Sequence, residues 1–365
     1  MELDLFIRDY LSAYAPYKDY WNYEDGCILR GCICLYRVTG NELYRDFVLS
    51  YLDRVVAEDG TITNYETAQY NIDSILCGRA LFFAFDMTGA SKWRRAIEYI
   101  MQRLQEHPRC ENGSFWHKEI YPWQIWLDGL YMALPFYMDY EMRFGGKSQI
   151  ADIMLQFDNA KRCLFDEEKK LSYHAYDERR EQPWADRETG CSANFWLRSM
   201  GWYLMAMADC LELIDEQLYE HKRRLEELFR EAVRGLLPYR NAEGLFFQLI
   251  DKPDLPGNYS ETSGSAMVAY VIMKGSRIAS LHPEKYAPAG RNIFDTLVSQ
   301  KLVPGPAGFR LMDICLVAGL GGQARRDGSA AYYLSEPVVA DDPKGVGPLM
   351  MAYAEALSQD IFKEV

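Results

Sequence analysis

Apolar residues recur at helical spacing along almost the whole chain, and few stretches show the alternation that a half-buried strand requires. Glycines fall at the breaks between these helical stretches. Strongly apolar helices are predicted near residues 26–38, 73–87, 128–143, 195–214, 261–280 and 345–358. Amphipathic, more charged helices are predicted between them, near residues 2–14, 42–57, 91–106, 148–163, 218–236 and 284–301.

A helix that is apolar on most of its surface belongs inside a fold, and a helix with one apolar face belongs outside. An internal similarity indicates that each apolar helix forms a hairpin with the amphipathic helix that follows it. The dipeptide Thr-Gly ends at Gly40 and again at Gly89, and each time an aromatic residue and an arginine follow at the same spacing. Both glycines are expected to end a helix in the left-handed conformation, and Gly145 to do the same for the next one. The pattern predicts an all-α fold, an (α/α)6 barrel of six helical hairpins with an inner ring of apolar helices and an outer ring of amphipathic helices. An open superhelix of the same hairpins is the alternative.

The chain has 365 residues, 49% of them hydrophobic, which is enough to bury a large core, and we expect residues 1–365 to form a single barrel domain. Its start lacks the features of an export signal, and no apolar segment reaches the roughly 20 residues of a membrane helix, so a cytoplasmic protein is expected. The nine scattered cysteines are typical of reduced thiols, and no metal site is predicted. A net charge of -13 argues against nucleic acid or an anionic membrane as partner.

Three carboxylates begin apolar helices at nearly the same distance before the turn glycines: Asp25, Asp73 and Asp128. In a closed ring these helix starts face one end of the barrel, so the three acids would meet around one cavity. Asp128 lies among Trp126 and other apolar residues, which favours the protonated form and makes it the candidate catalytic acid. The alternative is that each aspartate is only the N-cap of its helix.

Aromatic and cationic residues accompany these acids. Trp196, Arg198 and Trp202 stand at the start of the fourth apolar helix, and tryptophans beside polar groups suit a sugar ligand. Long loops add His117 with Lys118, and His174 within the loop from 166 to 194, whose length itself indicates function.

The strings at 126–133, 196–202, 259–266 and 334–337, followed by 342–347, resemble those of the unsaturated rhamnogalacturonyl hydrolases, glycoside hydrolase family 105. The resemblance covers essentially the whole chain. It implies an (α/α)6 barrel without metal or other cofactor, which removes a 4,5-unsaturated uronic acid from the non-reducing end of pectin-derived rhamnogalacturonan oligosaccharides. The expected ligand is a small anionic unsaturated disaccharide or short oligosaccharide.

The resemblance also implies roles for individual residues. Asp128 matches the proton donor, which would protonate C4 of the C4=C5 double bond before water adds at C5. Asp73 matches a second carboxylate, whose charge would help to keep Asp128 protonated. The expected substrate contacts are Asp25, His117, Lys118, Trp126, His174, Trp196, Arg198 and Trp202, with Arg198, Lys118 and the histidines as cations for the uronate carboxylate.

Two other functions remain open at this point. A sugar epimerase or isomerase on the same kind of barrel would use histidines as its acid and base. A non-catalytic helical-repeat carbohydrate-binding protein would need only an open groove.

Overall fold

The computed structural model describes residues 2–65, 68–322 and 326–364. Within these residues six inner helices follow one another around the molecule: α2 (Tyr23–Thr39), η1 (Ile72–Gly78) continued by α4 (Arg79–Thr88), α6 (Leu127–Arg143), α8 (Leu197–Leu213), α10 (Thr262–Arg277) and α13 (Pro343–Glu364). Each packs against the next, and α13 packs against α2. This last contact closes the ring, so the closed barrel is confirmed and the open superhelix is wrong.

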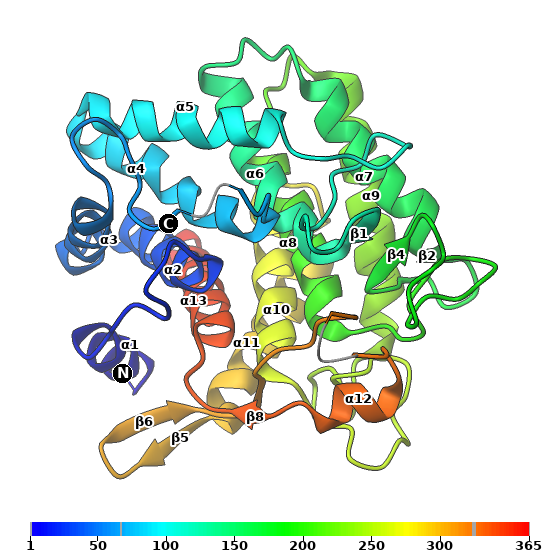
Figure 1. Ribbon diagram of the computed structural model, residues 1–365. Helices are drawn as coiled ribbons and strands as arrows, with labels where there is room; N and C mark the ends of the chain where they lie inside the picture. The colour runs from blue at the N-terminus through cyan, green and yellow to red at the C-terminus, as the bar shows by residue number, and fades with distance from the viewer. Residues whose placement is uncertain (1, 66–67, 323–325, 365) are drawn as a thin grey trace.

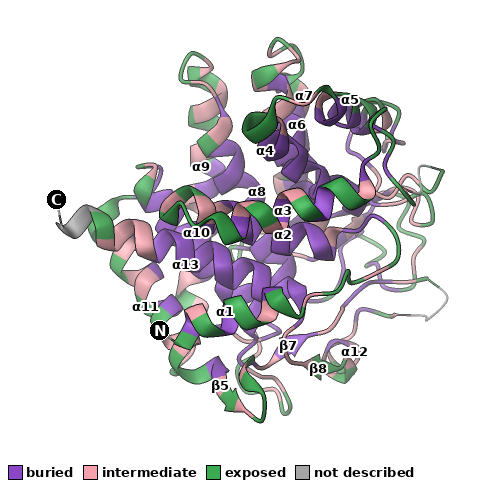
Figure 2. Cartoon of the chain, turned by 90° about the vertical axis from the view of Figure 1, so that its left-hand side faces the viewer, coloured by how far each residue is buried: buried purple, intermediate pink, exposed green. Residues whose placement is uncertain are grey.

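The outer helices alternate with the inner ones along the sequence, beginning with α1, and cover them from outside (Figure 1). They are α1 (Glu2–Ser12), α3 (Glu42–Val55), α5 (Ser91–Gln105), α7 (Ile150–Leu164), α9 (Tyr219–Leu236) and α11 (Pro283–Lys301). Burial follows the predicted division, because α8 is buried continuously from Leu197 to Leu211, whereas α9 buries one face only. Figure 2 shows the same contrast between the buried inner helices and the partly exposed α1 and α9.

The turn glycines were predicted correctly at two of the three positions. Gly40 and Gly89 both have a φ of 66° and donate their N–H groups to the last turns of α2 and α4. After α6 the left-handed residue is Gly146, with a φ of 66°, and not Gly145. Gly145 is required for another reason, since a Cβ there would lie 2.2 Å from Oε1 of Glu141.

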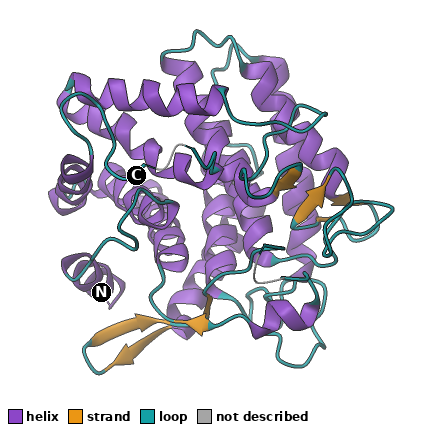
Figure 3. Ribbon diagram, viewed as in Figure 1, coloured by secondary structure: helices purple, strands orange, loops and turns teal. Residues whose placement is uncertain are grey.

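Short strands that the hydrophobic pattern did not predict lie in the loops between helices (Figure 3). They form antiparallel pairs: β1 (Gln124–Trp126) with β4 (Ala175–Asp177), β2 (Phe165–Asp166) with β3 (Leu171–Ser172), β5 (Leu302–Gly305) with β6 (Gly308–Leu311), and β7 (Ile314–Cys315) with β8 (Val338–Val339). The short helices η2 (Leu237–Tyr239) and α12 (Ala330–Ser335) complete the connections. No helix in the described ranges is long and apolar enough to cross a membrane.

Candidate active site

The aspartates at the starts of the first three inner helices are not the caps of those helices. Asn22 caps α2 by accepting the N–H of Asp25 at 2.9 Å, and Asn71 caps η1 by accepting the N–H of Asp73 at 3.1 Å. Helix α6 begins after Trp126, whose side chain makes no capping bond, and Asp128 lies in its first turn. The N-cap interpretation is therefore wrong, and the carboxylate oxygens are available for other contacts.

A cavity of about 160 Å³ opens at the N-terminal ends of these helices. Its walls include five residues predicted from the sequence, namely Asp73, His117, Lys118, Trp126 and Asp128. They also include residues that the sequence did not single out: Lys18, Tyr23, Glu24, Tyr121, Met132, Val317, Ala318, Gly319 and Arg326. Acids that are far apart in the sequence thus face one cavity, as the closed ring requires.

Asp73 is an ionised carboxylate held by a lysine. The ammonium of Lys118 lies 2.6 Å from Oδ2 of Asp73, and Nε2 of His117 lies 3.6 Å from Oδ1. Burial alone would raise the pKa of Asp73, but the charge of Lys118, with His117, outweighs it and lowers that pKa below its usual value. Burial would likewise lower the pKa of Lys118, and Asp73 reverses this, so that both groups stay charged as a pair.

His117 is a neutral, stacked side chain. Its ring lies parallel to that of Trp126, with centroids 4.3 Å apart, and burial lowers its pKa to about 4. The sequence-based expectation that it supplies positive charge is therefore wrong at neutral pH. The imidazole of His117 also packs closely against the backbone of α6 at Gly129, where a Cβ would lie only 3.3 Å from Nδ1 of His117.

His174 contacts Asp128 directly. The β1–β4 pair sets Ala175 opposite Trp126, and the N–H of Leu127 donates to the carbonyl of His174, which brings the imidazole to the start of α6. Its Nε2 lies 3.3 Å from Oδ2 of Asp128. On the other side, Nδ1 lies 2.7 Å from the hydroxyl of Tyr333, a buried residue of α12.

Arg198 does not line this cavity. Its guanidinium is buried and donates to the carbonyl of Cys315, to the hydroxyl of Ser263 at 3.2 Å and to the carbonyl of Leu316 at 3.4 Å. It also stacks over Trp196, with the guanidinium carbon 4.8 Å from the ring centroid. In this structure Arg198 therefore fixes the segment that follows β7 to the starts of α8 and α10.

Asp25 and Trp202 do not line the cavity either, and the same holds for His174 and Trp196. The carboxylate of Asp25 accepts hydrogen bonds from the Tyr14 hydroxyl, the Tyr17 N–H, the Asn22 amide and the Tyr51 hydroxyl. Trp202 is buried and stacks on Tyr131 at 5.1 Å. Both positions were inferred from their place at a helix start, which does not determine how deep a side chain lies.

The residue next to Asp25 reaches the cavity instead. Glu24 is buried, its Oε1 pairs with the ammonium of Lys18 at 2.7 Å, and its Oε2 has no hydrogen-bond partner in the described structure. Successive helix residues point about 100° apart, so a one-residue error selects a different face. The sequence could have indicated Glu24, because it is a second carboxylate next to Asp25 at the same helix start.

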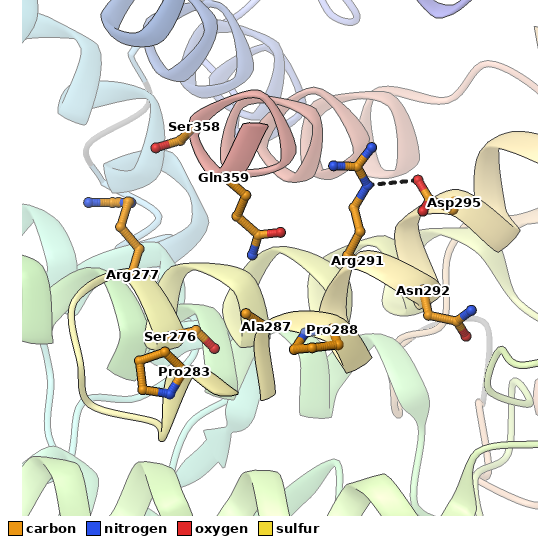
Figure 4. Close-up of a pocket in the computed structure, with 10 residues that line it drawn as sticks. All are labelled: Ser276, Arg277, Pro283, Ala287, Pro288, Arg291, Asn292, Asp295, Ser358 and Gln359. Carbon is orange, nitrogen blue, oxygen red and sulfur yellow. Dashed lines mark hydrogen bonds and ion pairs between the residues drawn. The ribbon is translucent and has the colours of Figure 1, made fainter. Parts of the chain in front are cut away.

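A larger hollow of about 610 Å³ lies at the other end of the inner helices (Figure 4). It is lined by the ends of α10 and α13 together with α11, and none of the predicted site residues borders it. Its arginines are already paired, Arg291 with Asp295 at 2.9 Å and Arg277 with Glu355 at 2.8 Å. Among the described residues no three histidine, cysteine or acidic side chains are grouped to hold a metal ion.

Comparisons with known proteins indicate one family of glycoside hydrolases. The family described as Glycosyl Hydrolase Family 88 matches residues 7–359. A solved structure of a glycoside hydrolase from family 105 of C. acetobutylicum ATCC 824 superposes with a TM-score of 0.93 and 39% identity, over 97% of this chain and 98% of that one.

Two curated proteins are also similar. Protein Atu3128 of Agrobacterium fabrum is 40% identical over 232 residues, which are 62% of this chain and 98% of that protein. The unsaturated rhamnogalacturonyl hydrolase YesR of Bacillus subtilis is 26% identical over 271 residues, which are 73% of this chain and 74% of that protein.

Proposed function

The chain belongs to Glycosyl Hydrolase Family 88 and is an unsaturated uronyl hydrolase, and on that premise we propose that it acts on rhamnogalacturonan fragments with Asp128 as its catalytic acid. The substrate would be a disaccharide or short oligosaccharide with a 4,5-unsaturated uronic acid at its non-reducing end. The name of the Bacillus subtilis relative supports this choice of substrate. Membership of a hydrolase family argues against the epimerase and the non-catalytic binding protein.

The observation that carries the proposal is the position of Asp128 at the cavity, between His174 and the Asp73–Lys118 pair. Burial of the Tyr333 hydroxyl raises its pKa well above the usual value, and this hydroxyl lies 2.7 Å from Nδ1 of His174. When the hydroxyl donates to Nδ1, the imidazole carries its proton on Nε2, which lies 3.3 Å from Oδ2 of Asp128. This contact leaves Oδ1 of Asp128 to carry the acidic proton toward the substrate.

The reaction requires one proton transfer in each direction. Asp128 protonates C4, the positive charge at C5 is shared with the ring oxygen, and water adds at C5 while its proton returns to the Asp128 carboxylate. The resulting C5 hemiketal opens to a ketone, and C1 becomes a hemiacetal that releases the aglycone as an alcohol. The net change is the addition of one water, and a single carboxyl group serves as acid and then as base.

The neighbouring residues fit this chemistry. Asp73 keeps its negative charge, although the Lys118 ammonium 2.6 Å away offsets much of the effect of that charge on Asp128. His117, Trp126 and Tyr121 line the cavity with their rings nearly parallel, Trp126 lying 4.3 Å from His117 and 5.1 Å from Tyr121. Flat aromatic faces of this kind pack against the C–H surface of a sugar ring.

The test is a substrate panel followed by absorbance. Purified protein is incubated with an unsaturated uronyl-rhamnose disaccharide, an unsaturated glucuronyl disaccharide from a glycosaminoglycan, and a saturated galacturonyl-rhamnose control. Hydration of C4=C5 removes the ultraviolet absorbance of the conjugated uronate, and we expect the fastest loss with the rhamnose conjugate. The saturated control has no such absorbance, so its cleavage is measured as released rhamnose, and we expect none. Preference for the glucuronyl substrate, or cleavage of the saturated control, would contradict the proposal.

A further inference from the structure

A uronate substrate brings a carboxylate into a cavity that already contains three acids, Glu24, Asp73 and Asp128. A cation must therefore face that carboxylate at short range, because the net charge of -13 opposes an anion at long range. The cations that line the cavity in the described structure are Lys18, Lys118 and Arg326. Which of them binds the substrate depends on which positive charge is not already neutralised by a protein carboxylate at ion-pair distance.

The two lysines are already paired. Lys118 lies 2.6 Å from Asp73 and Lys18 lies 2.7 Å from Glu24, both at ion-pair distance. A substrate carboxylate could displace either pair only by leaving a buried protein carboxylate without its counter-ion, which is strongly unfavourable. Arg198, outside the cavity, donates to backbone carbonyls.

Arg326 is different. The guanidinium makes no hydrogen bond to the described residues, and its nearest acidic contact is loose, with Nε 3.8 Å from Oε1 of Glu336. That oxygen of Glu336 instead accepts the hydroxyl of Tyr332 at 2.7 Å. An arginine with free donors at the wall of a polar cavity has the geometry to bind a planar anion through two parallel bonds.

Gly319 leaves the space that the guanidinium of Arg326 occupies. Gly319 borders the cavity beside Ala318, and a Cβ at position 319 would lie 2.4 Å from Nη1 of Arg326. Any residue with a side chain at 319 would push the guanidinium away. Because position 319 has no side chain, Nη1 of Arg326 can lie close to the backbone of Gly319 at the cavity wall.

We propose that Arg326, with the space provided by Gly319, binds the C5 carboxylate of the unsaturated uronic acid and so determines the preference for acidic sugars. The inference rests on the proposed function and names the residue that recognises its substrate. The carboxylate is attached at C5, next to the carbon that receives the proton. An anchor at Arg326 therefore fixes the double bond relative to Asp128 on the same cavity.

The test compares each enzyme variant on two substrates, the unsaturated uronyl disaccharide and its C6 methyl ester, which lacks the negative charge. For the natural enzyme we expect kcat/KM to favour the free acid by about 10- to 100-fold, as for a hydrogen bond between charged groups. Arg326→Gln should lose this preference, with a fall on the acid and little change on the ester. Gly319→Ala, which keeps the charge but displaces the guanidinium, should lose part of the preference.

Melting temperatures of both variants and the exposed-arginine control Arg223→Gln on α9 show whether a loss reflects misfolding. The control should keep the natural preference. If Arg326→Gln is folded and retains the preference for the acid, or if it falls equally on acid and ester, the assignment of Arg326 is wrong while the proposed function stands. If the natural enzyme acts on neither substrate, the proposed function fails, and the assignment fails with it.

Discussion

The imidazole of His174 lies with its Nε2 3.3 Å from Oδ2 of Asp128, although one residue comes from a long loop and the other from the first turn of α6. The β1–β4 pair makes this contact, because it fixes the loop backbone beside the helix start. Backbone hydrogen bonds between the two segments therefore place His174 beside Asp128.

Asp128→Asn should leave the fold intact, because the amide has nearly the shape of the carboxyl group. It removes the proton that C4 receives, so kcat should fall at least about 100-fold, the lower range for general acids. The measurement is the loss of ultraviolet absorbance of the unsaturated disaccharide, with the melting temperature as control. Turnover at the natural rate in a preparation free of the natural enzyme would end the assignment.

Tyr333→Phe should lower kcat without changing KM for the substrate. It removes the hydroxyl 2.7 Å from Nδ1 of His174 and so removes the contact that selects a tautomer of the imidazole, whose Nε2 lies 3.3 Å from Oδ2 of Asp128. One neutral hydrogen bond corresponds to about a fivefold to tenfold effect. The pH profile of kcat should shift as well, which a purely structural tyrosine would not cause; an unaltered profile with full kcat would show that Tyr333 only packs.

Asp73→Asn should reduce both activity and stability. The substitution leaves the buried Lys118 ammonium without its partner at 2.6 Å, which should cost about 1 to 3 kcal/mol of the free energy of unfolding. Removing the negative charge also changes the electrostatic potential in the cavity that Asp128 lines, so the pH profile of kcat should change. Urea unfolding and kcat measured across pH check the two effects separately, and an unchanged profile would remove Asp73 from the mechanism.

His117→Gln should make the protein less sensitive to mild acid. The pKa of His117 is lowered by burial to about 4 in the folded protein, against about 6.5 in an unfolded chain. Between these values only the unfolded chain takes up the proton, so His117 lowers the free energy of unfolding as the pH falls from about 6.5 to about 4, by about 3 kcal/mol in all.

Urea unfolding of the His117→Gln variant and of the natural protein at pH 7.5 and pH 4.5 measures the difference. His221→Gln on the outer helix α9 serves as the control and should behave like the natural protein. An equal loss of stability in all three proteins on acidification would contradict the prediction.

Arg198→Lys should lower the melting temperature and leave KM for the substrate nearly unchanged. A lysine cannot make the bonds that Arg198 donates together to the Cys315 carbonyl, the Ser263 hydroxyl and the Leu316 carbonyl. Buried acceptors left without donors should cost about 1 to 3 kcal/mol. Melting temperature and KM are measured on the same preparation. A raised KM with an unchanged melting temperature would instead place Arg198 in contact with the substrate.

The helices were predictable because each inner helix is apolar around most of its surface and each outer helix on one face only. The bounds of α9, Tyr219–Leu236, differ from the prediction by a single residue. The short strands were missed because strands of two to four residues are too short to show an alternating hydrophobic pattern. Their importance is out of proportion to their length, since β1 and β4 position His174.

The site was predicted in part. Asp73, His117, Lys118, Trp126 and Asp128 border one cavity, because the ring brings the helix starts together. The sequence did not indicate which charged groups are already paired. Lys118 forms an ion pair with Asp73, and Arg198 donates hydrogen bonds to backbone carbonyls. These contacts join segments that are distant in the sequence, so the sequence pattern does not show them.

Arg326 was missed for the same reason. It lies in a loop without periodicity, and its significance depends on Gly319 and on the loose contact with Glu336. None of these relationships follows from spacing along the chain. Only the three-dimensional arrangement distinguishes an arginine with free donors from one that is fully engaged.

The contact of α13 with α2 is a seam between the first and the last inner helices of the chain. Until α13 has been synthesised and docked, the remaining helices form an open crescent whose two ends, at α2 and α10, present apolar flanks to water. Such a partial ring is prone to aggregate with other chains, because its helices expose apolar surface. The nascent protein should therefore need protection from association until α13 has docked, and it should gain its enzymatic activity only with that docking.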